Sequence, residues 1–164
     1  LDAALTIFSQ VGYDAARLND IAKKADVTRG AIYHHFENKA GLFMALIDGA
    51  DSVGNKGIEA AVQEGGTFIE IMSRILVYGM ELMEEDRRFR EVMALTLSMT
   101  GESEELRDYR TKRQEQTEQL VQSIAGFFQM GLESGELRKN IDPVIAARAF
   151  LAYQSGLNLL WKET

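Results

Sequence analysis

The stretch VTRGAIYHHFENK, residues 27–39, holds both histidines of the 164-residue chain and places a glycine inside a segment that is otherwise typical of a helix. A glycine there costs roughly 1 kcal/mol relative to alanine. Thr28 is a favoured N-cap residue, because its hydroxyl can accept from free N–H groups of the first turn. Ile32 and Phe36 share the inward face of the predicted helix. The outward face carries four other residues: Arg29, Gly30, Tyr33 and His34.

Two more helices are predicted before this one. Apolar spacing favours a helix over the first dozen residues, ended by Gly12, and a second helix over residues 18–25. Asp26 then tolerates a left-handed turn, and Val27 is expected to be buried. Two short helices joined by a three- or four-residue turn, braced by a preceding helix, form a helix-turn-helix. In that motif the second helix lies in the DNA major groove.

The outward residues suit contact with DNA. Gly30 lacks a side chain where the helix would approach the duplex closely. Arg29 can reach guanine O6 and N7. Contacts to phosphate, or neutralisation of its charge, are expected from four neighbours: Thr28, Tyr33, His34 and Lys39.

The charge distribution fits a polyanion at one end of the molecule. The chain carries a net charge of −7, but residues 17–39 hold five basic and three acidic side chains. The rest of the chain holds 13 basic and 22 acidic residues. A small positive patch on an acidic body can dock on phosphate in one orientation. On charge alone, a solvated helix face explains the pattern equally well.

Composition predicts an all-α chain. Proline occurs once, helix formers are abundant, and alternating strand patterns are missing from the sequence. The chain has no cysteine, which excludes disulfides and thiolate chemistry and fits a reducing cytoplasm. Neither a run of 18 apolar residues nor a signal peptide is recognisable. The sequence opens inside an amphipathic helix without Met, and Thr164 directly follows an apolar helix. We therefore expect both chain ends to be incomplete.

We divide the chain into a DNA-binding domain, residues 1–47, and a helical ligand-binding and dimerisation domain, residues 48–164. Long helices are expected in the second part over these ranges: 39–64, 67–86, 87–99 (ending near Gly101), 102–137 and 140–164. Asp142 and Pro143 are suited to N-cap and N1 of the last helix. That helix is apolar on two faces, so one face can pack on a second subunit. The residues expected at that interface are Ile145, Ala149, Ala152, Gly156 and Leu160.

Six of the seven methionines lie between Phe68 and Met130, and this suggests an adaptable cavity as well as ordinary core. Helical position selects these lining residues: Asp51, Ile71, Ile75, Phe89, Met93, Tyr109, Gln114, Phe127, Phe150 and Tyr153. An acid such as Asp51 facing the cavity would favour cationic ligands.

The segment FSQVGYDAARLNDIAKKADVTRGAIYHHFENKAGLF, residues 8–43, resembles the DNA-binding domain of the TetR-type transcriptional repressors, and it is similar to their multidrug-efflux (AcrR-like) branch. The resemblance implies a homodimeric repressor, a palindromic operator, and C-terminal helices that hold an effector pocket and the dimer interface. It also implies DNA contacts at Thr28, Arg29, Gly30, Tyr33, His34, His35 and Lys39. Two departures are Asp26, where the family usually has Gly, and Arg17, where it usually has Thr or Ser. Arg17 can contact phosphate instead.

The function expected is therefore a ligand-responsive transcriptional regulator, released from a double-stranded DNA operator by a small hydrophobic or cationic molecule. The alternatives are an all-helical enzyme or lipid-binding bundle without DNA binding, and an adaptor dimer that ignores ligands. Against an enzyme, no nucleophile–base pair or phosphate-binding loop is recognisable. His34 and His35 point about 100° apart on a helix, so they cannot share a metal ion. We expect no catalytic residues, cofactor or metal, and no membrane partner.

Overall fold

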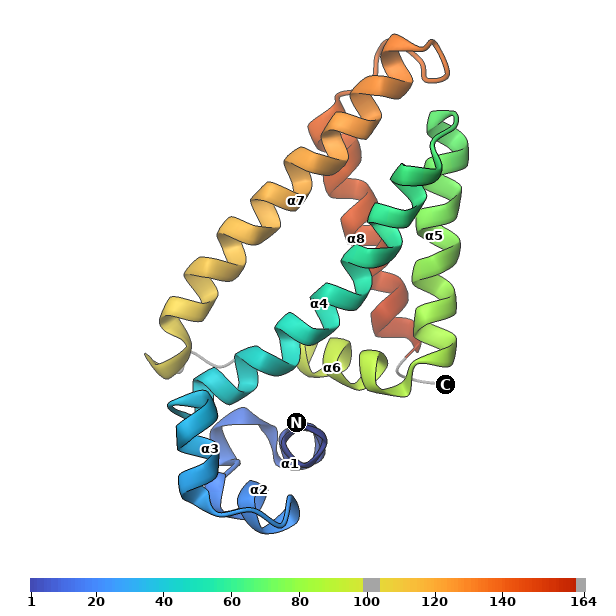
Figure 1. The fold of residues 1–164 in the computed structure, drawn as a ribbon. Helices are drawn as coiled ribbons and strands as arrows, with labels where there is room; N and C mark the ends of the chain where they lie inside the picture. The colour runs from blue at the N-terminus through green and yellow to red at the C-terminus, as the bar shows by residue number, and fades with distance from the viewer. Residues whose placement is uncertain (99–103, 162–164) are drawn as a thin grey trace.

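The computed structural model describes residues 1–98 and 104–161, and every regular element in these ranges is helical. The all-α prediction is confirmed. Three short helices form a small unit at one end, which we call the head: α1 (Asp2–Ala15), α2 (Leu18–Lys24) and α3 (Arg29–Phe36). The longer helices form the body (Figure 1): α4 (Lys39–Glu64), α5 (Phe68–Glu85), α6 (Arg87–Ser98), the 3₁₀ turn η1 (Glu104–Leu106), α7 (Arg107–Glu133) and α8 (Pro143–Trp161).

Local capping chemistry explains where several helices begin. The Thr28 hydroxyl accepts from the Ala31 N–H at 3.1 Å, and the Asn38 side chain accepts from the Gly41 N–H at 2.8 Å. Asp142 accepts from two N–H groups in the first turn of α8. These caps satisfy backbone donors that have no partner inside a helix. The caps at Thr28 and Asp142 were predicted from the sequence.

Two local predictions in the head, for Gly12 and Val27, have opposite outcomes. Gly12 interrupts α1 as predicted, with φ 77° and ψ 166°, and helical backbone resumes after this kink and runs to Ala15. The kink allows Tyr13 to turn into the core, where it is buried. Val27 is 47% exposed rather than buried, because Ile21 and Ile32 already fill the head core on either side of the turn. The predicted left-handed Asp26 is present, at φ 54°.

The head core continues into the body. Phe8 and Phe43 are fully buried, and their rings meet edge to face at 5.3 Å between centroids. The same apolar cluster includes two residues of α6 and Leu106 of η1. Next to it, the Tyr13 hydroxyl donates to Glu105 at 3.0 Å, and burial raises the Tyr13 pKa, with further contributions from Glu105 and Asp14. Head and body are therefore packed as one piece at this junction.

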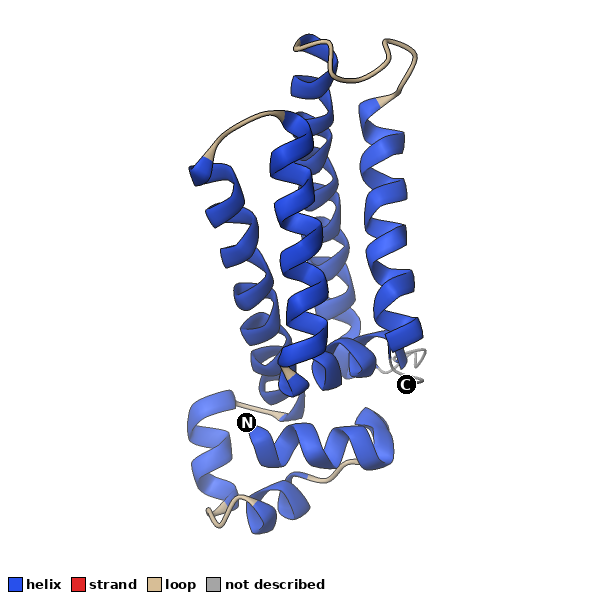
Figure 2. Cartoon of the chain, turned by 90° about the vertical axis from the view of Figure 1, so that its right-hand side faces the viewer, coloured by secondary structure: helices blue, strands red, loops and turns tan. Residues whose placement is uncertain are grey.

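Helix α4 belongs to both parts of the molecule. The domain boundary drawn between residues 47 and 48 falls within this 26-residue helix. In Figure 1, α4 leaves the head and rises through the body beside α5. The side view in Figure 2 shows the head helices lying across the lower end of the body helices. The division into residues 1–47 and 48–164 thus remains a functional proposal rather than a break in the chain.

The later helices follow the predicted order with shifted ends. The helix expected over residues 102–137 starts as the η1 turn and ends at Glu133, two residues before Gly135 at φ 80°. The predicted stop near Gly101 and the last three residues of the final helix lie outside the described residues. Within the described residues, no helix combines the length and the apolar character that crossing a bilayer requires.

Candidate functional site

The outward surface of α3 carries an exposed group of polar side chains, centred on Arg29 and Tyr33, which lie one helical turn apart. The Arg29 guanidinium donates to the Tyr33 hydroxyl at 2.7 Å and lies 5.1 Å from the centre of the Tyr33 ring. Tyr33 is 40% exposed, and Thr28 and Arg29 are exposed too. The pair holds a cation and a phenol edge toward solvent, where both can meet an anionic surface.

Gly30 has no structural reason to be a glycine. It lies inside α3 with helical geometry, and a Cβ built on it would meet only the Thr28 hydroxyl oxygen, at 3.8 Å. That distance is an ordinary van der Waals contact, so the helix would accept alanine. The space above Gly30 is therefore open for close approach by another molecule.

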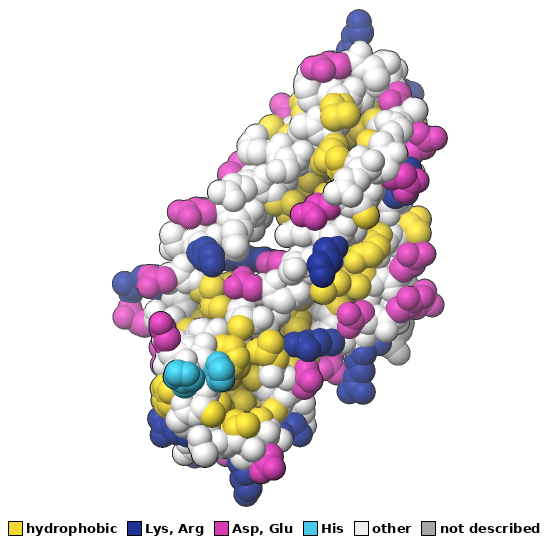
Figure 3. Space-filling model, in the orientation of Figure 1, with side chains coloured by type: hydrophobic (Ala, Val, Ile, Leu, Met, Phe, Trp, Pro, Cys, Tyr) yellow, Lys and Arg dark blue, Asp and Glu magenta, His cyan; other side chains and the backbone are white. Residues whose placement is uncertain are grey.

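Both histidines are exposed beside this group. Their rings lie 5.4 Å apart, and His35 also contacts the ring of Phe36. His35 remains exposed despite that contact, so it is not a packed core histidine. Figure 3 shows the two imidazoles side by side on the lower part of the molecule, with Lys and Arg side chains at its base.

Arg17 and Lys39 differ in what they offer to a ligand. Arg17 is exposed at the start of α2 and makes no side-chain cap there. Lys39 instead turns inward: its ammonium donates to the carbonyls of Tyr13, Asp14 and Ala16 and lies 4.3 Å from the centre of the Tyr13 ring. The prediction that Lys39 neutralises a phosphate does not fit this geometry, because its three donors are used inside the protein.

A pocket of about 770 Å³ opens in the body between α4, α5, α6, α7 and α8. Helices α4 and α7 diverge there, and Figure 3 shows the body hollowed between them with charged side chains at the rim. An ion pair from Arg113 of α7 to Asp51 of α4 spans the opening. The apolar wall includes Ile75, Phe89 and Phe150. A pocket of this size and mixed lining suits a drug-sized ligand.

Five of the ten predicted pocket residues line this pocket: Asp51, Ile75, Phe89, Met93 and Phe150. The other five lie elsewhere. Ile71 and Phe127 pack in an apolar cluster between α4, α5 and α7, and Tyr109 packs against Phe43 toward the head. Burial raises the pKa of Tyr109.

Gln114 and Tyr153 are exposed, because helical phase turns them away from the cavity. On α7 the cavity side is occupied instead by residues at helical spacing from Arg113: Gln116, Thr117, Leu120, Ser123 and Ile124. On α8 it is occupied by Phe150, Leu151 and Gln154. Sequence reasoning missed Arg113 and Tyr78 as lining residues. Tyr78 lies three residues after Ile75, and that spacing could have identified it.

The predicted interface residues form an outward stripe on α8. Ile145 is 67% exposed and Leu160 is 65% exposed, and Ala149 and Ala152 between them are exposed as well. Gly156 in the same stripe is partly buried. The opposite face of α8 packs inward through Ala147 and Phe150. The helix is thus apolar on a face that no described residue covers.

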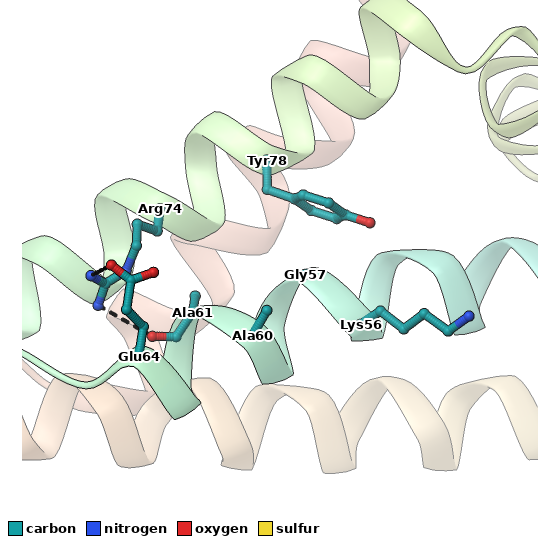
Figure 4. A pocket seen from close by; sticks show the side chains of 7 residues that line it. All are labelled: Lys56, Gly57, Ala60, Ala61, Glu64, Arg74 and Tyr78. Atoms are coloured by element: carbon teal, nitrogen blue, oxygen red, sulfur yellow. Dashed lines mark hydrogen bonds and ion pairs between the residues drawn. The ribbon is translucent and has the colours of Figure 1, made fainter.

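A second, smaller hollow of about 270 Å³ lies on the outer side of α4 and α5 (Figure 4). Two of its three charged side chains already have partners: Arg74 forms an ion pair with Glu64 at 2.8 Å and donates to the carbonyls of Ala61 and Gly65. Arg74 therefore caps the end of α4. Tyr78 and Lys56 line both this hollow and the larger pocket.

Comparison with known proteins identifies the type of domain that forms the head. Residues 1–46 match the family described as bacterial regulatory proteins, TetR family. Residues 1–46 therefore form a TetR-type DNA-binding domain. The TetR-type helix-turn-helix predicted from residues 8–43 is thereby confirmed, and α1–α3 are its helices.

Relatives from this family extend the likeness over the body. The HTH-type transcriptional regulator AcrR of Shigella flexneri is 36% identical over 96 residues, which is 58% of this chain but only 45% of that regulator. The HTH-type transcriptional regulator TtgR of Pseudomonas putida is 29% identical over 98% of this chain and 77% of its own length.

A solved structure supports the same fold. SmeT, the repressor of the Stenotrophomonas maltophilia multidrug efflux pump SmeDEF, superposes with a TM-score of 0.79 at 25% identity, over 96% of this chain and 73% of SmeT. These relatives are named as regulators and a repressor, not as enzymes. The names agree with the expectation that this chain is not an enzyme, and with the resemblance of residues 8–43 to the multidrug-efflux branch.

Proposed function

We propose that the chain is a cytoplasmic, ligand-responsive transcriptional repressor that binds a palindromic operator as a homodimer. A small hydrophobic or cationic molecule binds in the pocket between α4 and α8 and releases the DNA. Support comes from the TetR-family head, from relatives named as regulators of transcription, and from the pocket in the body.

The α3 surface is the proposed reading element. Arg29 reaches guanine O6 and N7 in the major groove, and Gly30 lets the helix approach closely. Contacts to phosphate come from the exposed polar side chains around them: Arg17, Thr28, Tyr33, His34 and His35. We assign Lys39 a different task, because its ammonium holds the start of α4 against the C-terminal end of α1.

The α8 stripe is the proposed dimer interface. Two copies packed through Ile145, Ala149, Ala152, Gly156 and Leu160 would bury the apolar side chains that each copy exposes. A two-fold dimer presents two heads to one duplex, so its operator has matching half-sites about 34–36 Å apart or in a simple relation to that distance.

The lining of the pocket favours a ligand with an apolar body and a positive charge. Three acids line it, Asp48, Asp51 and Glu59, against two bases, Lys56 and Arg113. Arg113 is already paired with Asp51, so Asp48 and Glu59 stay available to a cation. The aromatic and aliphatic wall supplies the contact area.

One observation carries the regulatory part of the proposal: α4 is a single helix that lines the pocket with Asp51 and enters the head at Lys39. A ligand that separates α4 from α7 must shift this helix, and the shift changes the spacing of the two heads. The operator is released to the extent that the ligand prefers the shifted dimer.

The test measures DNA binding and ligand response separately. Fluorescence anisotropy should show binding to a duplex from the region flanking the protein's own gene, with affinity falling steeply as salt rises. Cationic efflux substrates should then release the duplex. A chain that binds no duplex in preference to a scrambled one is instead the helical enzyme or lipid-binding bundle. A chain that binds DNA but ignores every ligand is an adaptor.

A further inference from the structure

Tyr78 occupies an unusual position on α5. Its ring lies where a side chain of residue 57 would be, since a Cβ built on Gly57 would come within 2.0 Å of the Tyr78 ring carbon Cδ1. Its hydroxyl donates to the Val53 carbonyl of α4 at 3.0 Å. Figure 4 shows the ring reaching from α5 toward α4 at Gly57. Only glycine at position 57 permits this contact.

The ring stands between the two hollows of the body. Tyr78 lines both the pocket of about 770 Å³ and the hollow of about 270 Å³. On α4, Gly54 and Ile58 face the larger pocket, whereas Gly57 and Ala60 face the smaller hollow. The boundary between the two spaces therefore runs along the seam of α4 and α5 at Tyr78.

We propose that Tyr78 is a specificity-determining residue that limits how long an effector the pocket accepts. The ring closes the pocket at the α4–α5 seam, and removing or displacing it joins the pocket to the outer hollow. This inference rests on the proposed effector pocket.

The outer hollow suits an apolar chain rather than a charged group. Its floor is made of small residues, Gly57, Ala60 and Ala61. The charges at its far end are satisfied, because Glu64 and the terminal nitrogens of Arg74 already bond to each other or to backbone carbonyls. An alkyl tail that passed Tyr78 would thus gain burial without breaking an ion pair. Each buried methylene strengthens binding by about fourfold.

The experiment uses n-alkyltrimethylammonium ions with tails of 8 to 14 carbons as probes and titration calorimetry as the readout. In the wild type we expect affinity to rise about fourfold per methylene and then to stop rising at a limiting length. Tyr78→Ala removes the ring, and Gly57→Ala forces it aside, so both variants should continue the rise to longer tails. Tyr78→Phe keeps the ring and should restore the wild-type limit. Val77→Ala, an exposed neighbour, is the matched control.

The outcomes separate this inference from the proposed function. An identical limiting length in the wild type, Tyr78→Ala and Gly57→Ala overturns the role of Tyr78, and operator release by the same probes would leave the repressor proposal standing. If the wild type binds none of the probes, the proposed effector pocket and the proposed role of Tyr78 are both wrong. The proposal of DNA binding is unaffected by that result. Gly57→Ala keeps the test decisive if Tyr78→Ala does not fold.

Discussion

Gly30 and Tyr33 are single residues on α3 that we propose serve a partner rather than the fold. An alanine at position 30 would meet no crowding, and Tyr33 makes its contacts to Arg29 on the exposed face. Neither residue contributes to the buried core of the head. In our proposal, Gly30 allows the close approach and Tyr33 makes the hydrogen bond that a DNA groove requires.

Gly30→Ala should move stability and DNA affinity in opposite directions. Loss of glycine from a helix interior should stabilise the fold by roughly 0.5–1 kcal/mol, while the added methyl group should weaken operator binding about tenfold. Thermal denaturation and anisotropy measure the two effects. The control is Gly49→Ala in α4, where an added Cβ meets nothing within 4 Å. That variant should gain stability and keep its affinity. Unchanged affinity in Gly30→Ala would remove the close approach from our proposal.

Tyr33→Ala should weaken operator binding about tenfold or more without loss of helicity. The change deletes an exposed hydroxyl and the support of the Arg29 guanidinium, each of which we assign to DNA contact. Tyr33→Phe keeps the ring beside Arg29, so its operator affinity should fall less than that of Tyr33→Ala. Circular dichroism must stay at the wild-type level, since a parallel fall in helicity and affinity would make Tyr33 structural.

At the scale of the element, the N-terminal end of α5 is capped by a carboxylate from another part of the chain. Glu136, in the connection after α7, accepts from the backbone N–H groups of Phe68 at 3.0 Å and Ile69 at 3.3 Å. Thr67 and Glu70 complete a capping box at the same end. Hydrogen bonding from the Phe68 N–H, with smaller contributions from Ile69 and Ser134, lowers the pKa of Glu136. The first turn of α5 is therefore tied to the end of α7.

Glu136→Gln should lower the melting temperature at pH 7, and the difference from the wild type should shrink in acid. A carboxylate with a depressed pKa stabilises the fold above its unfolded pKa, about 4.3, and loses that contribution as pH falls through its lower folded pKa. Melting curves between pH 7 and pH 3 test this. Glu115→Gln, at an exposed α7 residue whose side chain makes no hydrogen bond within the described residues, should change little. A difference that stays constant with pH would contradict the capping role.

At the scale of the whole molecule, shared helices connect the head, the pocket and the exposed face of α8. The head core includes α6 and η1 residues, α4 passes from the head to the pocket, and α8 packs on α7 with one face while exposing the other. Leu106 of η1 is only 1% exposed and lies in the head cluster, so the start of α7 is held against the head as well. Movements at the pocket can reach the head through either helix.

Leu160→Glu should convert the proposed dimer into monomers. The leucine side chain is exposed in one chain, and a carboxylate in its place would be buried without a partner between two α8 stripes. Sedimentation equilibrium should show the mass of a monomer in place of that of a dimer. Affinity for a palindromic duplex should fall toward the affinity for a single half-site. Val11→Glu, at another exposed apolar site in the head, should remain dimeric. Dimers of Leu160→Glu as stable as those of the wild type would place the interface elsewhere.

The amino-acid sequence by itself determined the helical class, the order of the helices, the caps at Thr28 and Asp142, and the outward face of α3. These features depend on residues within about four positions of one another, so local spacing is enough to predict them. Only the tertiary structure decided that Lys39 turns inward, that Arg113 pairs with Asp51 62 positions away, and that Tyr78 rests on Gly57. Such contacts depend on how far helices rotate and diverge as they pack, which is set by the whole core and not by any one segment.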